Sequence, residues 1–370
     1  MSDHENQSIS SWTGFNIKSA ETLQWSRTLK SYLPTINAPA TEMSTVNEVL
    51  EQTHAIMQSL QLNKIVCVFD QALYAKAAEV LWKQEKFKNI IIRMGVFHTI
   101  CNLLSTIGKR FQDAGLRDLC VESGVIAEGS MSGVMDGRRY NRAVRLHKLV
   151  YEALMRLAWK GFLPWLEEKP FKGHTPSGWN TEEHHSFHSN VSQGTFQELM
   201  ESESCTHILK LFQVYLETLR DEHNLSAFWM SYLDMVEIML DLVRASREGN
   251  WMLHLGAIRQ MIPWCFAYDK VNYARFLTYY YAMMSRLPIE HPEVHEHFMQ
   301  GGFSVQIGSK NPFGRIPVDQ TIEETINKDT RGHKRLQPER WSCRQVLPDI
   351  GVSQQILEAA QGHGSRPKVY

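Results

Sequence analysis

Two short apolar runs separated by a helical pattern mark the centre of this sequence. Residues 65–69 are apolar and partly β-branched, residues 71–84 repeat apolar side chains at helical steps, and residues 90–92 are three isoleucines. This order predicts a strand, a helix and a second strand. Runs this short and apolar are typical of strands buried on both faces, so we expect parallel neighbours with a right-handed crossover.

Two polar side chains follow these predicted strands. Asp70 comes directly after the first strand, and His98 lies just beyond the second. Ligand chemistry in open α/β sheets sits at the carboxyl ends of the strands, so the two residues indicate a site. The alternative is structural: Asp70 caps the helix that follows it, and His98 is a packed core histidine.

Apolar side chains at helical spacing predict that most of the remaining chain is helical. Helices are expected at 41–60, 99–107, 111–122, 138–163, 196–222, 227–248, 251–267 (interrupted near Pro263) and 268–286. Residues 12–40 are expected to be extended or turn-rich, with room for one strand. A strand is expected at 301–307, a loop at 311–317, and a helix at 319–327 with Asp319 near its N-cap. Core packing explains the dense aromatic residues between 229 and 281, and stacking on exposed bases is the alternative.

The pattern favours an α/β fold that is mainly α by residue count. We expect a disordered tail at 1–11, the first part of an α/β core at 12–122, a helical insertion at 123–300 with a mobile loop at 167–195, a return to the core at 301–330, and a weakly ordered tail at 331–370.

Composition narrows the class of protein. The 370 residues are 43% hydrophobic and 21% charged with a formal net charge of −1, so a polyanion site would have to be a local patch. Six scattered cysteines without a CxxC pair indicate reduced, intracellular thiols. The polar N-terminus and the absence of a long apolar run predict neither a signal peptide nor a membrane partner.

Two polar clusters have both a functional and a structural interpretation. Arg138, Arg142, Arg145 and Lys148 recur along the predicted helix 138–163 and can bind the phosphates of a nucleic acid. Such a stripe can equally be a solvated helix face. The polar loop carries His184, His185 and His188, which can be metal ligands or incidental histidines.

Long segments of the chain resemble a group of uncharacterised, multicopy, transposon-associated proteins of aquatic invertebrates and fishes. These segments are FDQALYAKA (69–77), RMGVFHTICNLLSTIGKRFQDAGLRDL (93–119), GRRYNRAVRLHKLVYEAL (137–154), REGNWMLHLGAIRQMIPWCFAYDKVNYARFL (247–277) and DQTIEETINKDT (319–330). That group is in turn similar to DDE-type transposases of the Mutator-like and Kyakuja–Dileera–Zisupton superfamilies, which have a ribonuclease-H-like core.

The resemblance implies a site and a ligand. It assigns catalytic roles to Asp70, His98 and Glu323, with Asp70 and Glu323 binding Mg²⁺ or Mn²⁺, because such metals prefer carboxylate oxygens. It implies DNA as the partner, possible self-association and a nuclear location. The sequence departs from the pattern at the first core strand, where TGFNI offers Asn16 and no aspartate.

Three hypotheses follow. The chain is a transposase-related protein that binds DNA and cuts or joins strands; or it is a non-catalytic interaction scaffold on the same core; or it is an unrelated helical protein in which Asp70 and His98 are structural. In the first hypothesis the carboxylates of Asp70 and Glu323 lie about 4–8 Å apart.

Overall fold

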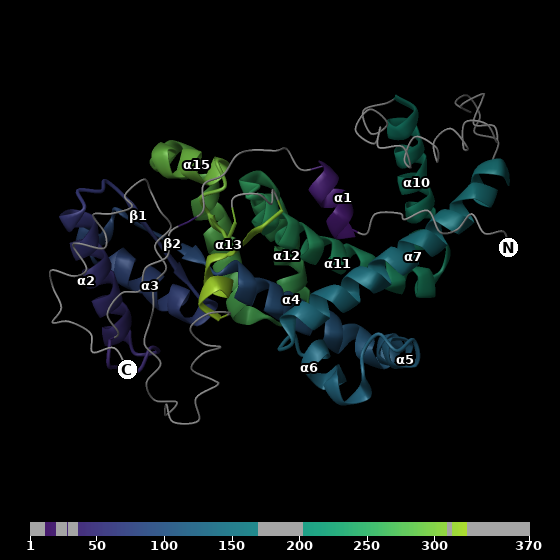
Figure 1. The fold of residues 1–370 in the computed structure, drawn as a ribbon, viewed down its shortest axis with the longest axis horizontal. Coiled ribbons are helices and arrows are strands. Elements are labelled where there is room, and N and C mark those ends of the chain that lie inside the picture. Colours follow the sequence, from purple (N-terminus) through teal and green to yellow (C-terminus); the bar gives the residue numbers. More distant parts are fainter. Residues whose placement is uncertain (1–11, 20–27, 29–35, 169–202, 309–312, 324–370) are drawn as a thin grey trace. The chain divides into compact units, whose positions relative to one another are not determined.

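A computed structural model describes residues 12–19, 28, 36–168, 203–308 and 313–323. Within these ranges the chain is mainly helical, with a few short strands (Figure 1). It divides into two compact units. Unit 1 comprises Met1–Ala20, Arg110–Val134 and Arg139–Glu237, and unit 2 comprises Glu21–Lys109, Met135–Arg138 and Ile238–Tyr370.

A pair of parallel strands lies in the core of unit 2. Strand β1 (Ile65–Phe69) pairs with β2 (Ile90–Met94), with Ile65 opposite Ile90. Helix α3 (Gln71–Lys83) connects them and packs against both. The strand–helix–strand prediction is therefore confirmed. Asp70 caps α3, because its Oδ1 accepts a hydrogen bond of 2.8 Å from the backbone N–H of Leu73.

Helices surround this pair of strands. In unit 2, α2 (Met43–Ser59) packs against α3 and β2, α13 (Val271–Ser285) packs against α3 and β2, and α12 (Trp251–Ala267) packs along α13. The short helices α14 (Leu287–Glu290) and α15 (Pro292–Met299) follow, and α4 (Val96–Phe111) begins at the end of β2. Trp251, Phe276 and Tyr280 are buried, so core packing is confirmed for these aromatic residues.

Helix α12 does not break at Pro263, contrary to the prediction. The helix runs without interruption from Trp251 to Ala267, and Pro263 lies on its exposed side. A proline removes one backbone N–H from the helix, but the packing of α12 along α13 holds the helix together on either side of it.

A small hairpin completes the described part of unit 2. Strand β3 (Ser304–Gln306) pairs antiparallel with β4 (Arg315–Pro317), and residues 318–323 are helical. Val305, Ile316 and Val318 form a small apolar cluster against Val68 of β1. Strand β4 lies where a loop was expected, because three residues are too few for a visible alternating pattern.

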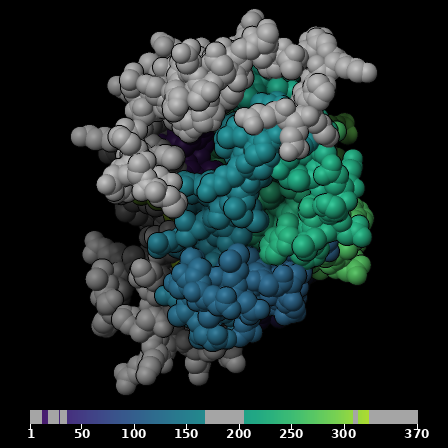
Figure 2. Space-filling model, turned by 90° about the vertical axis from the view of Figure 1, so that its right-hand side faces the viewer, coloured from purple at the N-terminus to yellow at the C-terminus, as the bar shows by residue number. Residues whose placement is uncertain are grey.

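Unit 1 contains helices and turns but no strand among its described residues. It contains α1 (Trp12–Ser19), η3 (Gln112–Ala114), α5 (Leu116–Glu122), η4 (Glu128–Ser130), α7 (Tyr140–Glu168), α10 (Glu203–Glu222) and the first half of α11 (Asn224–Glu248). Helix α6 (Met131–Met135) lies at the unit boundary, and η2 (Glu85–Phe87) belongs to unit 2. Helix α7 packs against α10, with Phe162, Phe212 and Tyr215 in the apolar cluster that the two helices share. In the space-filling view, the teal surface of the chain adjoins its blue-green surface (Figure 2).

The expected extended segment at 12–40 is wrong where the structure describes its start. Residues Trp12–Ser19 form α1, and the backbone N–H of Trp12 donates to Glu152 Oε1 at 3.0 Å. Asn16 is buried, and its side-chain amide donates back to the Trp12 carbonyl at 2.7 Å, so this asparagine lies within a helix and not on a strand. The histidine-rich loop lies outside the described residues, as do the two predicted tails.

Candidate functional site

The end of β2 is joined to α4 by a single glycine, Gly95. Its backbone N–H donates to the Phe69 carbonyl at 2.7 Å, and its carbonyl accepts from the Thr99 hydroxyl at 2.8 Å. An added Cβ at Gly95 would lie 2.3 Å from Oδ2 of Asp319. Gly95 is therefore needed because another side chain approaches the backbone closely at this point.

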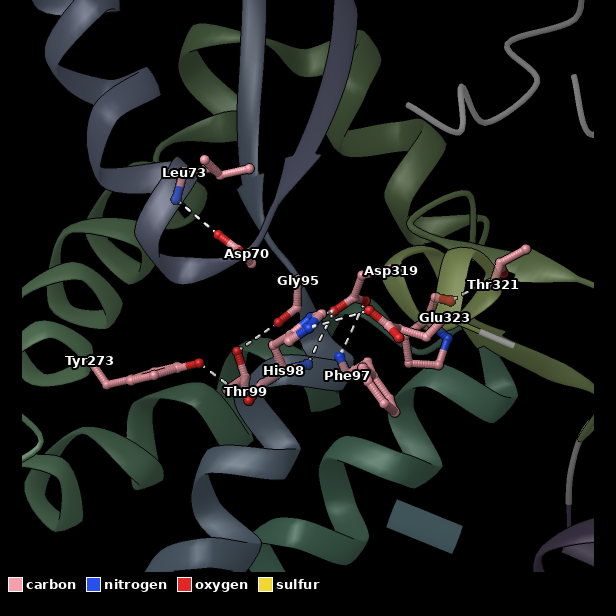
Figure 3. Close-up of polar contacts among 11 residues, drawn as sticks. Asp70, Leu73, Gly95, Phe97, His98, Thr99, Tyr273, Asp319, Thr321 and Glu323 are labelled. Carbon is pink, nitrogen blue, oxygen red and sulfur yellow. Dashed lines mark hydrogen bonds and ion pairs between the residues drawn. The ribbon is translucent and has the colours of Figure 1, made fainter. Parts of the chain in front are cut away.

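Asp319 caps α4 rather than its own helix. Its Oδ1 accepts a hydrogen bond from the Phe97 N–H at 3.2 Å, and its Oδ2 accepts one from the His98 N–H at 3.1 Å (Figure 3). The first turn of a helix has unsatisfied N–H groups and a partial positive charge, and a carboxylate stabilises both. The helix at 318–323 therefore supplies a cap to a helix more than two hundred residues earlier in the chain.

The same carboxylate orients the His98 ring. Nδ1 of His98 lies 3.1 Å from Oδ2 of Asp319, and Nε2 lies 4.0 Å from Oε1 of Glu323. A carboxylate accepts, so Nδ1 carries a proton and Nε2 is the nitrogen left for chemistry. The His98 side chain is 37% exposed and Asp319 only 10%, so the ring is accessible while its partner is not. The Tyr273 hydroxyl donates to the His98 carbonyl at 3.2 Å.

Three carboxylates govern the charge of this ring. Burial lowers the His98 pKa, but the hydrogen bond and charge of Asp319, with the charges of Asp70 and Glu323, more than offset it, so the pKa is raised. Nearby on α4, burial and the charges of Asp319 and Glu323 raise the pKa of Cys101 to about 12. At neutral pH this thiol is protonated and a poor nucleophile.

The raised His98 pKa predicts a pH dependence of stability. The imidazolium interaction stabilises the folded state fully below the unfolded pKa of about 6.5, and is lost as pH rises through the higher folded pKa. We expect the difference in unfolding free energy between the wild type and His98→Gln to shrink from pH 6 to pH 8.5 in urea titrations. A difference that grows over this range would contradict the assignment.

The structure brings together most of the predicted catalytic residues. His98 lies beside the Glu323 carboxylate and within electrostatic reach of Asp70. Asp70 also caps α3, so the prediction that it is a helix cap is confirmed. A further role for Asp70 in the site stays a prediction. In Figure 3 the Asp70 carboxylate points to the start of α3, whereas Asp319 and Glu323 point towards His98. The sequence predicted Asp319 only as a helix cap. Its position four residues before Glu323, which puts both side chains on one face of a helix, was the signal that could have added Asp319 to the site.

Comparison with known protein families identifies the family of this chain. A family defined from sequence, the domain of unknown function DUF8702, matches residues 11–337. The chain belongs to the DUF8702 family. No curated protein and no solved structure matches this sequence. The matched range includes every residue of the candidate site, and the site is therefore part of the DUF8702 domain.

Three of the four basic residues that were predicted to bind nucleic acid contact neighbouring side chains in this DUF8702 chain. Arg138 forms an ion pair with Asp136. Arg142 donates to the Ser130 hydroxyl at 2.9 Å, and Lys148 donates to the Thr13 hydroxyl at 3.1 Å. Arg145 is exposed. A role for the four residues in binding nucleic acid stays a prediction.

Metal ligation was also predicted for this domain. Among the described residues, no group of three or more histidine, cysteine, aspartate or glutamate side chains is arranged to hold a metal ion. Asp319 directs both oxygens to α4 and His98, and Asp70 Oδ1 accepts from Leu73. The described side chains therefore do not fit a three-ligand metal site, and the metal-binding roles of Asp70 and Glu323 stay predictions. None of the described helices has the length and hydrophobicity that crossing a membrane requires.

Proposed function

We propose that this DUF8702 chain acts on DNA through an acid–base site centred on His98, and that it is related to DDE-type transposases. One observation supports the acid–base role of His98. Asp319 fixes the ring through Nδ1, while Nε2 faces Glu323 and the side chain is partly exposed. A histidine oriented by a carboxylate is a common general acid or base. The resemblance of the sequence supports DNA as the substrate, and a nuclear location follows from that substrate.

Each residue has a distinct role in this proposal. Neutral His98 accepts a proton from water or a hydroxyl group at Nε2, and Asp319 holds the ring and stabilises the imidazolium that forms. Glu323 faces the same nitrogen and stabilises the charge that His98 acquires. Because the pKa of His98 is raised, the base form becomes populated at a higher pH than it does for an ordinary histidine.

A ribonuclease-H-like core is the fold that we propose to underlie this site. Its support is the order of elements: a parallel strand pair with Asp70 and His98 at the strand ends, a helical insertion, and a late helix that bears Glu323. The first-strand aspartate of a DDE enzyme has no counterpart in α1, where Asn16 lies within a helix. We therefore assign no step of the reaction to a metal ion.

Strand cleavage tests the proposal directly. We expect the wild-type chain to nick labelled DNA and His98→Gln to do so at least about 100-fold more slowly, because a general base is lost. The measurement is single-turnover nicking with EDTA, Mg²⁺ or Mn²⁺. His223→Gln, which changes an exposed histidine of unit 1, is the matched control.

The other outcomes are equally informative. Equal rates of nicking by His98→Gln and the wild type would show that His98 is not the general base. Nicking that requires a divalent cation and is lost in both Asp70→Ala and Glu323→Gln would support the predicted metal ligands. DNA binding without nicking under any condition would favour the non-catalytic scaffold.

A further inference from the structure

A buried arginine in β2 has no role in the proposed reaction. Arg93 is 1% exposed and lies opposite Val68 in the strand pair. A guanidinium stays charged at any accessible pH, and burying an unpaired charge is costly. No described aspartate or glutamate forms an ion pair with Arg93. Something other than a described carboxylate must compensate this charge.

Aromatic rings surround the guanidinium but do not neutralise it. Its Cζ lies 5.6 Å from the centroid of the Trp251 ring, 5.0 Å from that of Phe298 and 5.3 Å from that of Phe303. One nitrogen, Nη1, donates to the Phe303 carbonyl at 2.7 Å. Ring faces attract a cation, yet they carry no net charge, so the site as a whole remains positive.

Three polar atoms, one on Arg93 and two on neighbouring side chains, have no hydrogen-bond partner among the described residues. They are Nε of Arg93, Nε1 of Trp251 and Nδ1 of His254. The side chains contact one another, because the His254 ring stacks on Trp251 with centroids 5.1 Å apart. Buried polar atoms are nearly always paired, so three such atoms on side chains in contact with one another point to a ligand.

The protonation of His254 makes these atoms a set of donors. Burial and the charge of Arg93 hold the His254 pKa well below its usual value, so the ring is neutral. Its Nε2 lies 2.9 Å from the Tyr280 hydroxyl. When Tyr280 donates to Nε2, the ring proton resides on Nδ1. Arg93, Trp251 and His254 then present three N–H groups and one positive charge.

We propose that Arg93, Trp251 and His254 bind a small monovalent anion, such as chloride, inside the core of unit 2. The anion neutralises the guanidinium and accepts the three unused N–H groups. A carboxylate from the chain would do the same, but the described elements around Arg93 supply none. The site is distinct from the His98 site, and its existence does not depend on the proposed function.

Anion-dependent stability tests this site. We expect the wild-type melting temperature to rise by roughly 3 °C when gluconate is replaced by chloride or bromide at constant ionic strength, because a ligand bound only to the folded state stabilises it. Arg93→Met should abolish the rise. Arg315→Met is the control for the loss of a buried arginine elsewhere in unit 2, because Arg315 is also buried and its Nη1 donates to the Gly301 and Ser304 carbonyls. An unchanged rise in Arg93→Met would overturn the proposal.

A crystal of the wild-type chain grown in bromide provides a second measurement that requires no variant to fold. An anomalous peak within hydrogen-bond distance of Arg93 Nε and Trp251 Nε1 would establish the site. A water molecule at that position, with no anomalous signal, would reject it.

Discussion

Gly95→Ala should be one of the two most damaging single substitutions in the candidate site, lowering the free energy of unfolding by about 2–4 kcal/mol. The new Cβ would lie 2.3 Å from Oδ2 and 2.8 Å from Cγ of Asp319. Aspartate is a short side chain, and hydrogen bonds to Phe97 and His98 hold it in place. The clash can be relieved only by moving Asp319, which breaks those bonds.

Gly256→Ala is the matched control for this prediction. Gly256 lies inside α12, and an added Cβ there meets no atom within 4 Å. Alanine favours a helix over glycine by about 1 kcal/mol, so this variant should be neutral or stabilised. The checks are urea unfolding and the His98 pKa measured by NMR. A Gly95→Ala variant with wild-type stability and an unchanged His98 pKa would contradict the described position of Asp319.

Asp319→Ala should cost about 3–4 kcal/mol and lower the His98 pKa. It removes the acceptor for two backbone N–H groups of α4 and for the imidazole at once. Asp70→Ala provides the comparison, because Asp70 also caps a helix at the end of a strand but accepts one N–H. A cap of that kind contributes about 1 kcal/mol.

These two variants separate the contribution of a helix cap from that of the hydrogen bonds between Asp319 and His98. Urea unfolding measures the stability of each, and NMR titration follows the His98 ring. Equal destabilisation of Asp70→Ala and Asp319→Ala would show that the hydrogen bonds from His98 to Asp319 contribute little. A His98 pKa that stays raised in Asp319→Ala would show that Asp70 and Glu323 dominate the charge of the ring.

Local pattern was enough to predict the centre of unit 2. The apolar runs of β1 and β2 and the helical spacing of α3 lie within thirty residues, so neighbouring positions carry the signal. The prediction failed at α1, where the helix is tied by Trp12 to Glu152, 140 residues away. It failed again at β4, a strand of three residues that pairs with β3 and belongs to an apolar cluster packed against Val68.

The sequence predicted some residues of the candidate site but not the contacts of Asp319 with α4 and His98. The strand-end rule placed His98 with Asp70, and the resemblance added Glu323 to the site; within the described residues, Oε1 of Glu323 lies 4.0 Å from Nε2 of His98. Nothing local indicated that Asp319 would cap α4, because both partners of that cap are ordinary side-chain and backbone groups far apart in sequence. The sequence likewise does not show that position 95 requires glycine, because that requirement comes from the Asp319 carboxylate beside it.

The cap on α4 has a consequence for the order in which this chain can fold during synthesis. Phe97 and Asp319 are 222 residues apart, and residues of unit 1 are translated between them. A ribosome adds about 5–20 residues per second, so α4 waits on the order of ten seconds or more for its partner. Throughout that interval the nascent chain has β1, α3 and β2 but lacks the carboxylate that caps α4. The site around His98 becomes complete only once the segment that bears Asp319 and Glu323 has been synthesised.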